Sequence, residues 1–177
     1  MKILSISGTL VGSKTSLLTK TLSEELQQKM PNAEMEFLDL RDFQLEFCAG
    51  KAISQYNEDT QKVVGKIAEA DAFIMGTTIL HGSMPGVLKN LFELVPIEHF
   101  ADKCVLFAAT GGNSLHYLAI ESSVKPVANY LKMFVLPEYI FATSSDFNEQ
   151  NEVTEKVRQE ANEILGKYAM YINKLMN

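Results

Sequence analysis

Short apolar runs alternate along the chain with longer segments in which apolar residues recur every three or four positions. Short runs of this kind are typical of β-strands, and the longer spacing is typical of helices that pack one face on a sheet. We therefore predict five strands, over residues 2–7, 33–40, 72–76, 103–109 and 133–141. We also predict five helices, over residues 15–30, 58–69, 84–95, 115–132 and 151–174.

The regular alternation of strand and helix predicts an α/β fold, because neighbouring parallel strands need a helical connection. The third and fourth predicted strands are almost entirely apolar, which places them at the centre of a sheet covered on both faces. We expect a five-stranded parallel sheet of order 2-1-3-4-5 with helices on both faces. In that order the carboxyl ends of strands one, three and four meet at a crevice that binds ligands.

The chain has 177 residues, 46% of them hydrophobic, which is enough for one domain with a sizeable core over residues 1–177. Its formal net charge of −6 argues against nonspecific binding to nucleic acids or to an anionic membrane surface. No apolar run approaches the roughly 20 residues of a membrane-spanning helix, and a strand begins at once without the pattern of a signal peptide. Cys48 and Cys104 lie far apart without a CxxC pattern, so we expect free thiols, no metal site and a cytoplasmic protein.

The connection after the first strand, ILSISGTLVGSKTS at residues 3–16, carries the strongest chemical signal. The first N–H groups of a helix have no partner within the helix, and the helix dipole favours negative charge there, so phosphate binds readily at such a position. Around these groups the segment places one amine, Lys14, and hydroxyls at Ser7, Thr9, Ser13, Thr15 and Ser16. The spacing matches neither the Walker A motif nor the dinucleotide fingerprint, so an ordinary capped turn stays an alternative for this segment alone.

The connections after the third and fourth strands carry weaker signals of the same kind. GTTILHGSMPGVLKN, residues 76–90, turns sharply at Gly82 before the next helix begins. ATGGNSLHYLA, residues 109–119, holds Gly111 and Gly112, which permit a positive φ and a close approach to a flat ring. A glycine pair alone is more often an ordinary turn. Three such loops at one edge of the sheet favour a nucleotide-sized crevice.

These segments resemble the NADPH-dependent FMN reductase family, flavodoxin-like proteins that include flavin, azo, quinone and chromate reductases. The resemblance covers nearly the whole chain, through SGTLVGSKTS, LDLRDFQLEF, TTILHGSMPGVLKN and ATGGNSLHYLA. PGVLKN is the most specific piece, and ATGGNSLHYLAIESSVKP looks closest to flavin reductases that supply sulfonate monooxygenases. The resemblance implies a flavodoxin-like three-layer sandwich.

By position, the resemblance places the FMN phosphate and ribityl chain on Ser7, Thr9, Ser13, Lys14, Thr15 and Ser16. It places the isoalloxazine ring between Thr77, Thr78, Ile79, Leu80 and His81 on one edge and Thr110, Gly111 and Gly112 on the other. The family's loop arginine corresponds to Val11, so Lys14 has to supply the local charge, as a point charge without a guanidinium fork. The proline and tyrosine of the family's TPxY motif correspond to Thr78 and Leu80, and the missing aromatic contact would suit a flavin that exchanges readily.

The resemblance implies an NAD(P)H-dependent FMN oxidoreductase, a flavoprotein that takes hydride from NADPH or NADH. Electrons would pass to free flavin, a quinone, an azo compound or a similar small-molecule acceptor. A monooxygenase would be a protein partner that receives reduced flavin. Hydride transfer between two cofactors needs orientation and a dry surface, so we predict no catalytic acid or base. The family forms dimers and tetramers, so we expect a homodimer or homotetramer, with the segment 117–132 as a candidate surface.

Two other functions are compatible with the same fold. A flavodoxin-type electron carrier would bind FMN without nicotinamide chemistry, but carriers resemble TGNTE-like loops, and this chain has no tryptophan to shield the ring. A flavin-binding or flavin-less protein that has lost activity is the third candidate, because fold alone does not guarantee function. Val11 and Leu80, which replace family residues, leave room for it.

Overall fold

The computed structural model describes residues 1–175, and its strands form one parallel sheet. The strand order is β2-β1-β3-β4-β5, with β6 also paired to β4, so the predicted order is confirmed. The strands are β1 (Lys2–Ser7), β2 (Glu34–Asp39), β3 (Ala72–Thr78), β4 (Cys104–Thr110), β5 (Phe134–Val135) and β6 (Ile140–Ala142).

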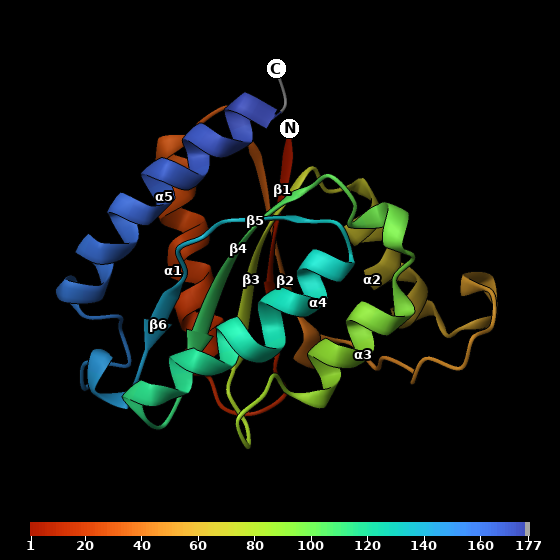
Figure 1. Ribbon diagram of the computed structural model, residues 1–177, viewed down its shortest axis with the longest axis horizontal. Coiled ribbons are helices and arrows are strands. Elements are labelled where there is room, and N and C mark those ends of the chain that lie inside the picture. Colours follow the sequence, from red (N-terminus) through yellow and green to blue (C-terminus); the bar gives the residue numbers. More distant parts are fainter. Residues whose placement is uncertain (176–177) are drawn as a thin grey trace.

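Helices cover both faces of this sheet, as predicted. The α-helices are α1 (Lys14–Lys29), α2 (Glu58–Glu69), α3 (Gly86–Leu94), α4 (Lys125–Tyr130) and α5 (Glu155–Leu175). Figure 1 shows α1 and α5 on one side of the sheet and α2, α3 and α4 on the other. No helix within residues 1–175 combines the length and the apolar character needed to cross a membrane.

Each face of the sheet has its own hydrophobic core. Successive side chains of a strand point to opposite faces, so Leu4 and Ile6 of β1 pack with α2, α3 and α4. Ile3, which precedes Leu4 in the strand, points to the other face and packs with α1 and α5. β3 and β4 are buried along nearly their whole length, which confirms their predicted central position.

The prediction of one continuous strand over 133–141 is wrong. β5 ends at Val135 and β6 begins at Ile140, and both pair with β4. The four residues between them lie opposite only two residues of β4, so the chain bulges away from the sheet. Pro137 lies in this bulge and has no N–H to donate to a neighbouring strand.

The prediction of a regular helix over 115–132 is also wrong. The segment contains a 3-10 turn at Ser114–Tyr117, a π-helical turn at Ile120–Val124 and only then α4. Pro126 explains the change, because a proline has no N–H and its ring clashes with the carbonyl four residues earlier in an α-helix. The chain widens there, and the N–H of Lys125 donates to the carbonyl of Ile120, five residues back.

The remaining helix boundaries differ less from the prediction. α3 is shorter by two residues at its start and one at its end. α5 begins at Glu155 and not at residue 151, because Asn151 has a φ of 60° and lies in a turn closed by pairing between Phe147 and Val153. Positive φ is tolerated by asparagine better than by most residues, but it cannot continue a right-handed helix.

Candidate functional site

The connections after β1, β3 and β4 converge on one cavity of about 400 Å³, which confirms the predicted convergence. The cavity lies at the carboxyl edge of the sheet, which is the lower edge in Figure 1, opposite the two termini. Its lining consists of Val11, Gly12, Ser13, Lys14, Thr15, Thr78, Ile79, Leu80, Thr110, Gly111, Gly112, Thr143 and Ser144.

The amino end of α1 opens into this cavity without a cap. Ser13 is the N-cap residue, its side chain makes no capping hydrogen bond, and the first turn holds no acidic residue. Within residues 1–175, no acceptor takes the backbone N–H groups of residues 13–16. Four unpaired donors, the positive end of the helix dipole and the amine of Lys14 are a donor set that fits a phosphate group.

Thr110, at the end of β4, connects the three loops. Its hydroxyl lies 2.7 Å from the hydroxyl of Thr15 in α1, and both side chains are buried. Its carbonyl oxygen accepts from the N–H of Ile79 at 2.9 Å and from the hydroxyl of Thr78 at 3.4 Å. The cavity walls are therefore held by direct hydrogen bonds between segments that lie far apart in the sequence.

The loop after β3 is a tight two-residue hairpin. The backbone of Leu80 and the backbone of Ser83 exchange two hydrogen bonds, of 2.9 and 3.1 Å. His81 and Gly82 between them have φ values of 49° and 80°, as the favoured hairpin turn requires. This geometry directs the backbone of Ile79 and Leu80 into the cavity and leaves His81 at the exposed tip.

A glycine is needed at position 111 because of close packing and not because of an unusual backbone conformation. Neither Gly111 nor Gly112 has a positive φ, so that part of the prediction is wrong. A Cβ on Gly111 would lie 2.9 Å from both the Cβ of His116 and the Cζ of Phe141, whereas a Cβ on Gly112 would meet nothing within 4 Å. The cavity wall at Gly111 is thus set by the side chains packed behind it.

Nine of the predicted site residues line the cavity and five do not. The nine are Ser13, Lys14, Thr15, Thr78, Ile79, Leu80, Thr110, Gly111 and Gly112. The five outside the lining are Ser7, Thr9, Ser16, Thr77 and His81.

The polar groups of four of these five residues are turned to other partners or enclosed. The hydroxyl of the buried Thr77 donates to the carbonyl oxygen of Thr78 at 3.1 Å. The hydroxyl of Thr9 accepts from the N–H of Val11 at 3.1 Å and so shapes the loop. The hydroxyl of Ser16 donates to Asp39 at 2.7 Å. Ser7 is fully buried at the end of β1, and its hydroxyl has no partner within residues 1–175.

Five residues at the site are not among the predicted site residues, and two of them, Val11 and Gly12, belong to the loop after β1 and line the cavity. Thr143 and Ser144 follow β6 and line the cavity. Thr143 and Asp146 form a reciprocal capping box, and the Thr-x-x-Asp spacing that predicts it is visible in the sequence. The fifth is Arg41, which lies outside the lining and whose Nη1 donates to the carbonyl oxygen of Gly12 at 3.0 Å.

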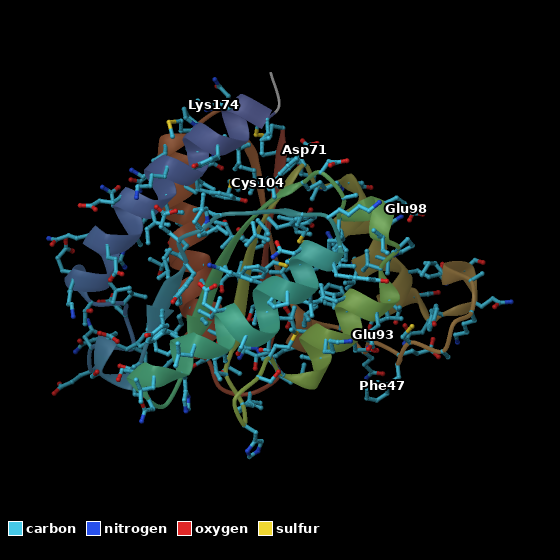
Figure 2. All side chains as sticks on the ribbon, viewed as in Figure 1. Phe47, Asp71, Glu93, Glu98, Cys104 and Lys174 are labelled. Carbon is cyan, nitrogen blue, oxygen red and sulfur yellow. The ribbon has the colours of Figure 1, made fainter. Side chains whose placement is uncertain are left out.

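The other candidate features lie away from this cavity. A larger cavity of about 1020 Å³ lies between the loop around Cys48, α3 and α4, near Glu93 in Figure 2. Cys48 and Cys104 are both free, as predicted, and burial raises the pKa of the Cys104 thiol to about 11. Figure 2 shows Cys104 near Asp71, at the sheet edge opposite the loops. Within the part of the chain that the structure describes, no cluster of His, Cys, Asp or Glu could hold a metal ion.

Fold and site together define a doubly wound α/β protein with a cavity that suits a phosphate-bearing ligand where the strand order reverses. The family model described as NADPH-dependent FMN reductase matches residues 1–148. An NAD(P)H-dependent FAD/FMN reductase from Geobacillus thermodenitrificans is 44% identical over 170 residues, which are 93% of this chain and 92% of that protein.

Two further proteins extend the comparison. An NADPH-type FMN reductase from Pseudomonas aeruginosa is 32% identical over 158 residues, covering 89% of this chain and 84% of that one. The solved structure of a flavoenzyme NAD(P)H:(acceptor) oxidoreductase from Paracoccus denitrificans has a TM-score of 0.79 at 18% identity, over 98% of this chain and 97% of that one, and supports the fold.

The chain belongs to the NADPH-dependent FMN reductase family. The expected family, the enzyme class and the use of FMN with NAD(P)H are confirmed at the level of the family. Among the three expected functions, the comparisons support the reductase over the electron carrier and the inactive protein.

Proposed function

We propose that this enzyme transfers hydride from NAD(P)H to an FMN seated in the 400 Å³ cavity. It then delivers the reduced flavin to a monooxygenase or passes the electrons to a small-molecule acceptor. One observation carries the proposal. The uncapped amino end of α1, with Lys14 beside it, opens into a cavity whose other walls are the ends of β3 and β4. Phosphate and a flat ring are the two parts of FMN that such walls suit.

Each wall has a separate task in this proposal. The N–H groups of residues 13–16 and the amine of Lys14 bind the phosphate. The backbone of residues 78–80 and the backbone of residues 110–112 border the two edges of the ring. When bound, FMN supplies the hydride-accepting chemistry, and the chain supplies orientation and exclusion of water.

The rim of the cavity supports an exchangeable flavin. Val11 is 60% exposed and Leu80 is 37% exposed, so the two positions where the family carries an arginine and a tyrosine offer neither a guanidinium nor a stacked ring. Aromatic stacking contributes about 0.5–1.5 kcal/mol beyond burial. Its absence at Leu80 favours release of reduced flavin over permanent retention.

The enzyme has no free guanidinium with which to select NADPH. Arg41 is paired with Asp39 and Arg158 with Glu25, and these are the chain's only two arginines. A 2′-phosphate is usually bound by an arginine fork. We therefore infer that the enzyme accepts NADH as well as NADPH.

A purified-protein assay tests this function. NADH and NADPH consumption is followed spectroscopically with added FMN and with the quinone menadione. We expect both nicotinamides to be oxidised, and only when flavin is present. An FMN-bound protein that leaves both nicotinamides unoxidised would be a carrier, and a protein that binds no FMN would have lost the activity.

We also propose a homodimer or homotetramer in the cytoplasm. Large apolar side chains are exposed along the segment that leads into α4, among them Leu115 and Leu118, and Tyr130 at the end of α4. Exposed apolar patches of this kind mark association surfaces. The two free thiols support a reducing compartment.

A further inference from the structure

Arg41 lies at the same sheet edge as the phosphate loop although it comes from the neighbouring strand. It sits in the 3-10 turn Leu40–Asp42 that follows β2, and β2 pairs with β1. Its guanidinium Nη1 donates to the carbonyl oxygen of Gly12 at 3.0 Å. Gly12 itself lines the cavity.

Asp39 fixes the orientation of this guanidinium. Its Oδ1 accepts from the Nε of Arg41 at 3.0 Å and its Oδ2 from Nη2 at 2.6 Å, so the contact is bidentate. The same carboxylate accepts from the backbone N–H of Arg41 and from the hydroxyl of Ser16. Burial alone would raise the pKa of Asp39, but the hydrogen bonds from Arg41 and Ser16 outweigh it and lower that pKa. The pair is therefore ionised and held in place at neutral pH.

The position of the Gly12 carbonyl determines the direction of the next N–H. A peptide unit is planar and trans, so the carbonyl of Gly12 and the N–H of Ser13 point in opposite directions. Arg41 holds the carbonyl of Gly12, so the N–H of Ser13, one of the four unpaired donors, points away from Arg41. Gly12 has a φ of 71° and lacks a side chain, so little else in the loop restrains this peptide.

We propose that Arg41 is a positioning residue for the phosphate of the flavin, acting through the Gly12–Ser13 peptide. This inference rests on the proposed function. It explains how the loop works with Val11 in place of an arginine, because a guanidinium from the next strand orders the backbone donors that bind phosphate. The carboxylate of Asp39 neutralises the charge of Arg41, so the effect is one of orientation and not of direct attraction.

Two flavins that differ only in the phosphate test the proposal. Dissociation constants for FMN and riboflavin are measured by fluorescence quenching on the full chain, in the wild type and in Arg41→Ala. We expect FMN affinity to fall about tenfold or more, since hydrogen bonds to a charged group are affected. Riboflavin affinity should not change, because riboflavin has no phosphate. Equal losses for both flavins, or no loss for either, would overturn the proposal.

Asp39→Asn separates orientation from charge. The variant keeps the positive charge of Arg41 and removes a negative charge near the phosphate, so direct attraction predicts tighter FMN binding. Orientation predicts weaker FMN binding with unchanged riboflavin binding, because the bidentate contact is lost. Tighter binding would overturn the proposal.

Arg158→Ala is the matched control, since this arginine pairs with Glu25 between α5 and α1. It should leave both flavin affinities unchanged, and a loss of FMN affinity equal to that of Arg41→Ala would overturn the proposal. Arg41→Lys keeps the charge without the fork and should resemble Arg41→Ala. A wild type that binds neither flavin contradicts the proposed function itself, whereas normal FMN binding in every variant contradicts only the role of Arg41.

Discussion

Gly111 is the site residue at which a single methyl group should matter most. A Cβ at this position would lie 2.9 Å from carbon atoms of both His116 and Phe141, closer than packed side chains allow. Gly111→Ala therefore forces either the loop backbone or the side chains packed behind it to shift, at the wall of the cavity. We expect FMN affinity to fall about tenfold or more, because the shift should cost at least one hydrogen bond between the loop backbone and the flavin. A flavin fluorescence titration measures the dissociation constant for FMN in the variant and in the wild type.

The neighbouring glycine is the control for this substitution. A Cβ on Gly112 would have no atom within 4 Å, and the backbone there has no positive φ. Gly112→Ala should thus bind FMN as the wild type does. If both alanine variants lose flavin to the same extent, crowding behind Gly111 is not the cause and our account of this wall is wrong.

At the level of single residues, the sequence predicts which positions reach the site better than it predicts what their side chains bind. Ser13, Lys14 and Thr15 line the cavity because they begin a helix at the end of β1, and that boundary is visible in the sequence. The hydroxyl of Ser16 instead donates to Asp39, 23 residues away. A hydroxyl has several possible acceptors, and which one lies nearest depends on the pairing of β1 with β2.

Among the elements, prediction succeeds where the pattern is uninterrupted and fails where a proline interrupts it. The bounds of β1 and α2 are predicted to the residue. Pro137 interrupts the fifth predicted strand, and Pro126 interrupts the fourth predicted helix. The apolar patterns of these two segments are nevertheless those of a strand and a helix. Periodicity reports which side faces the core, but it does not report a missing N–H. The capping box at Thr143, which follows the same broken strand, is different, because its Thr-x-x-Asp spacing is visible in the sequence.

Tyr168 of α5 connects a helix to two strands. Its side chain is fully buried, and its hydroxyl donates to the carbonyl of Phe73 in β3 at 2.5 Å and to that of Cys104 in β4 at 3.1 Å. Tyr168→Phe keeps the ring and removes the donor from two buried carbonyls. We expect the free energy of unfolding to fall by about 1 kcal/mol, measured by urea denaturation.

Tyr171, one turn later in α5, provides the comparison. It is 42% exposed, so Tyr171→Phe should change the free energy of unfolding by less than about 0.5 kcal/mol. Equal effects at the two positions would mean that the hydroxyl of Tyr168 does not anchor α5 to the sheet.

On the scale of the whole molecule, the two helical faces differ in what they expose. The face of α2, α3 and α4 carries the cavity of about 1020 Å³, lined largely by apolar side chains, with Tyr130 at 75% exposure on its border. Leu115 and Leu118, in the segment between the cavity of about 400 Å³ and α4, add apolar surface at 64% and 53% exposure. A projecting ring beside a hollow makes one surface self-complementary, which suits a two-fold symmetric contact because each copy then supplies both parts.

The proposed oligomer therefore depends on Tyr130. In sedimentation velocity, the wild type should run as a dimer or tetramer at micromolar concentration. Tyr130→Asp should shift it toward the monomer, since a charged group would have to be buried against the hollow of the partner copy. Tyr171→Asp, on the α5 side of the sheet, should leave the oligomer unchanged. A monomeric wild type would contradict the oligomer itself, and an oligomer that tolerates aspartate at position 130 would place its interface on another surface.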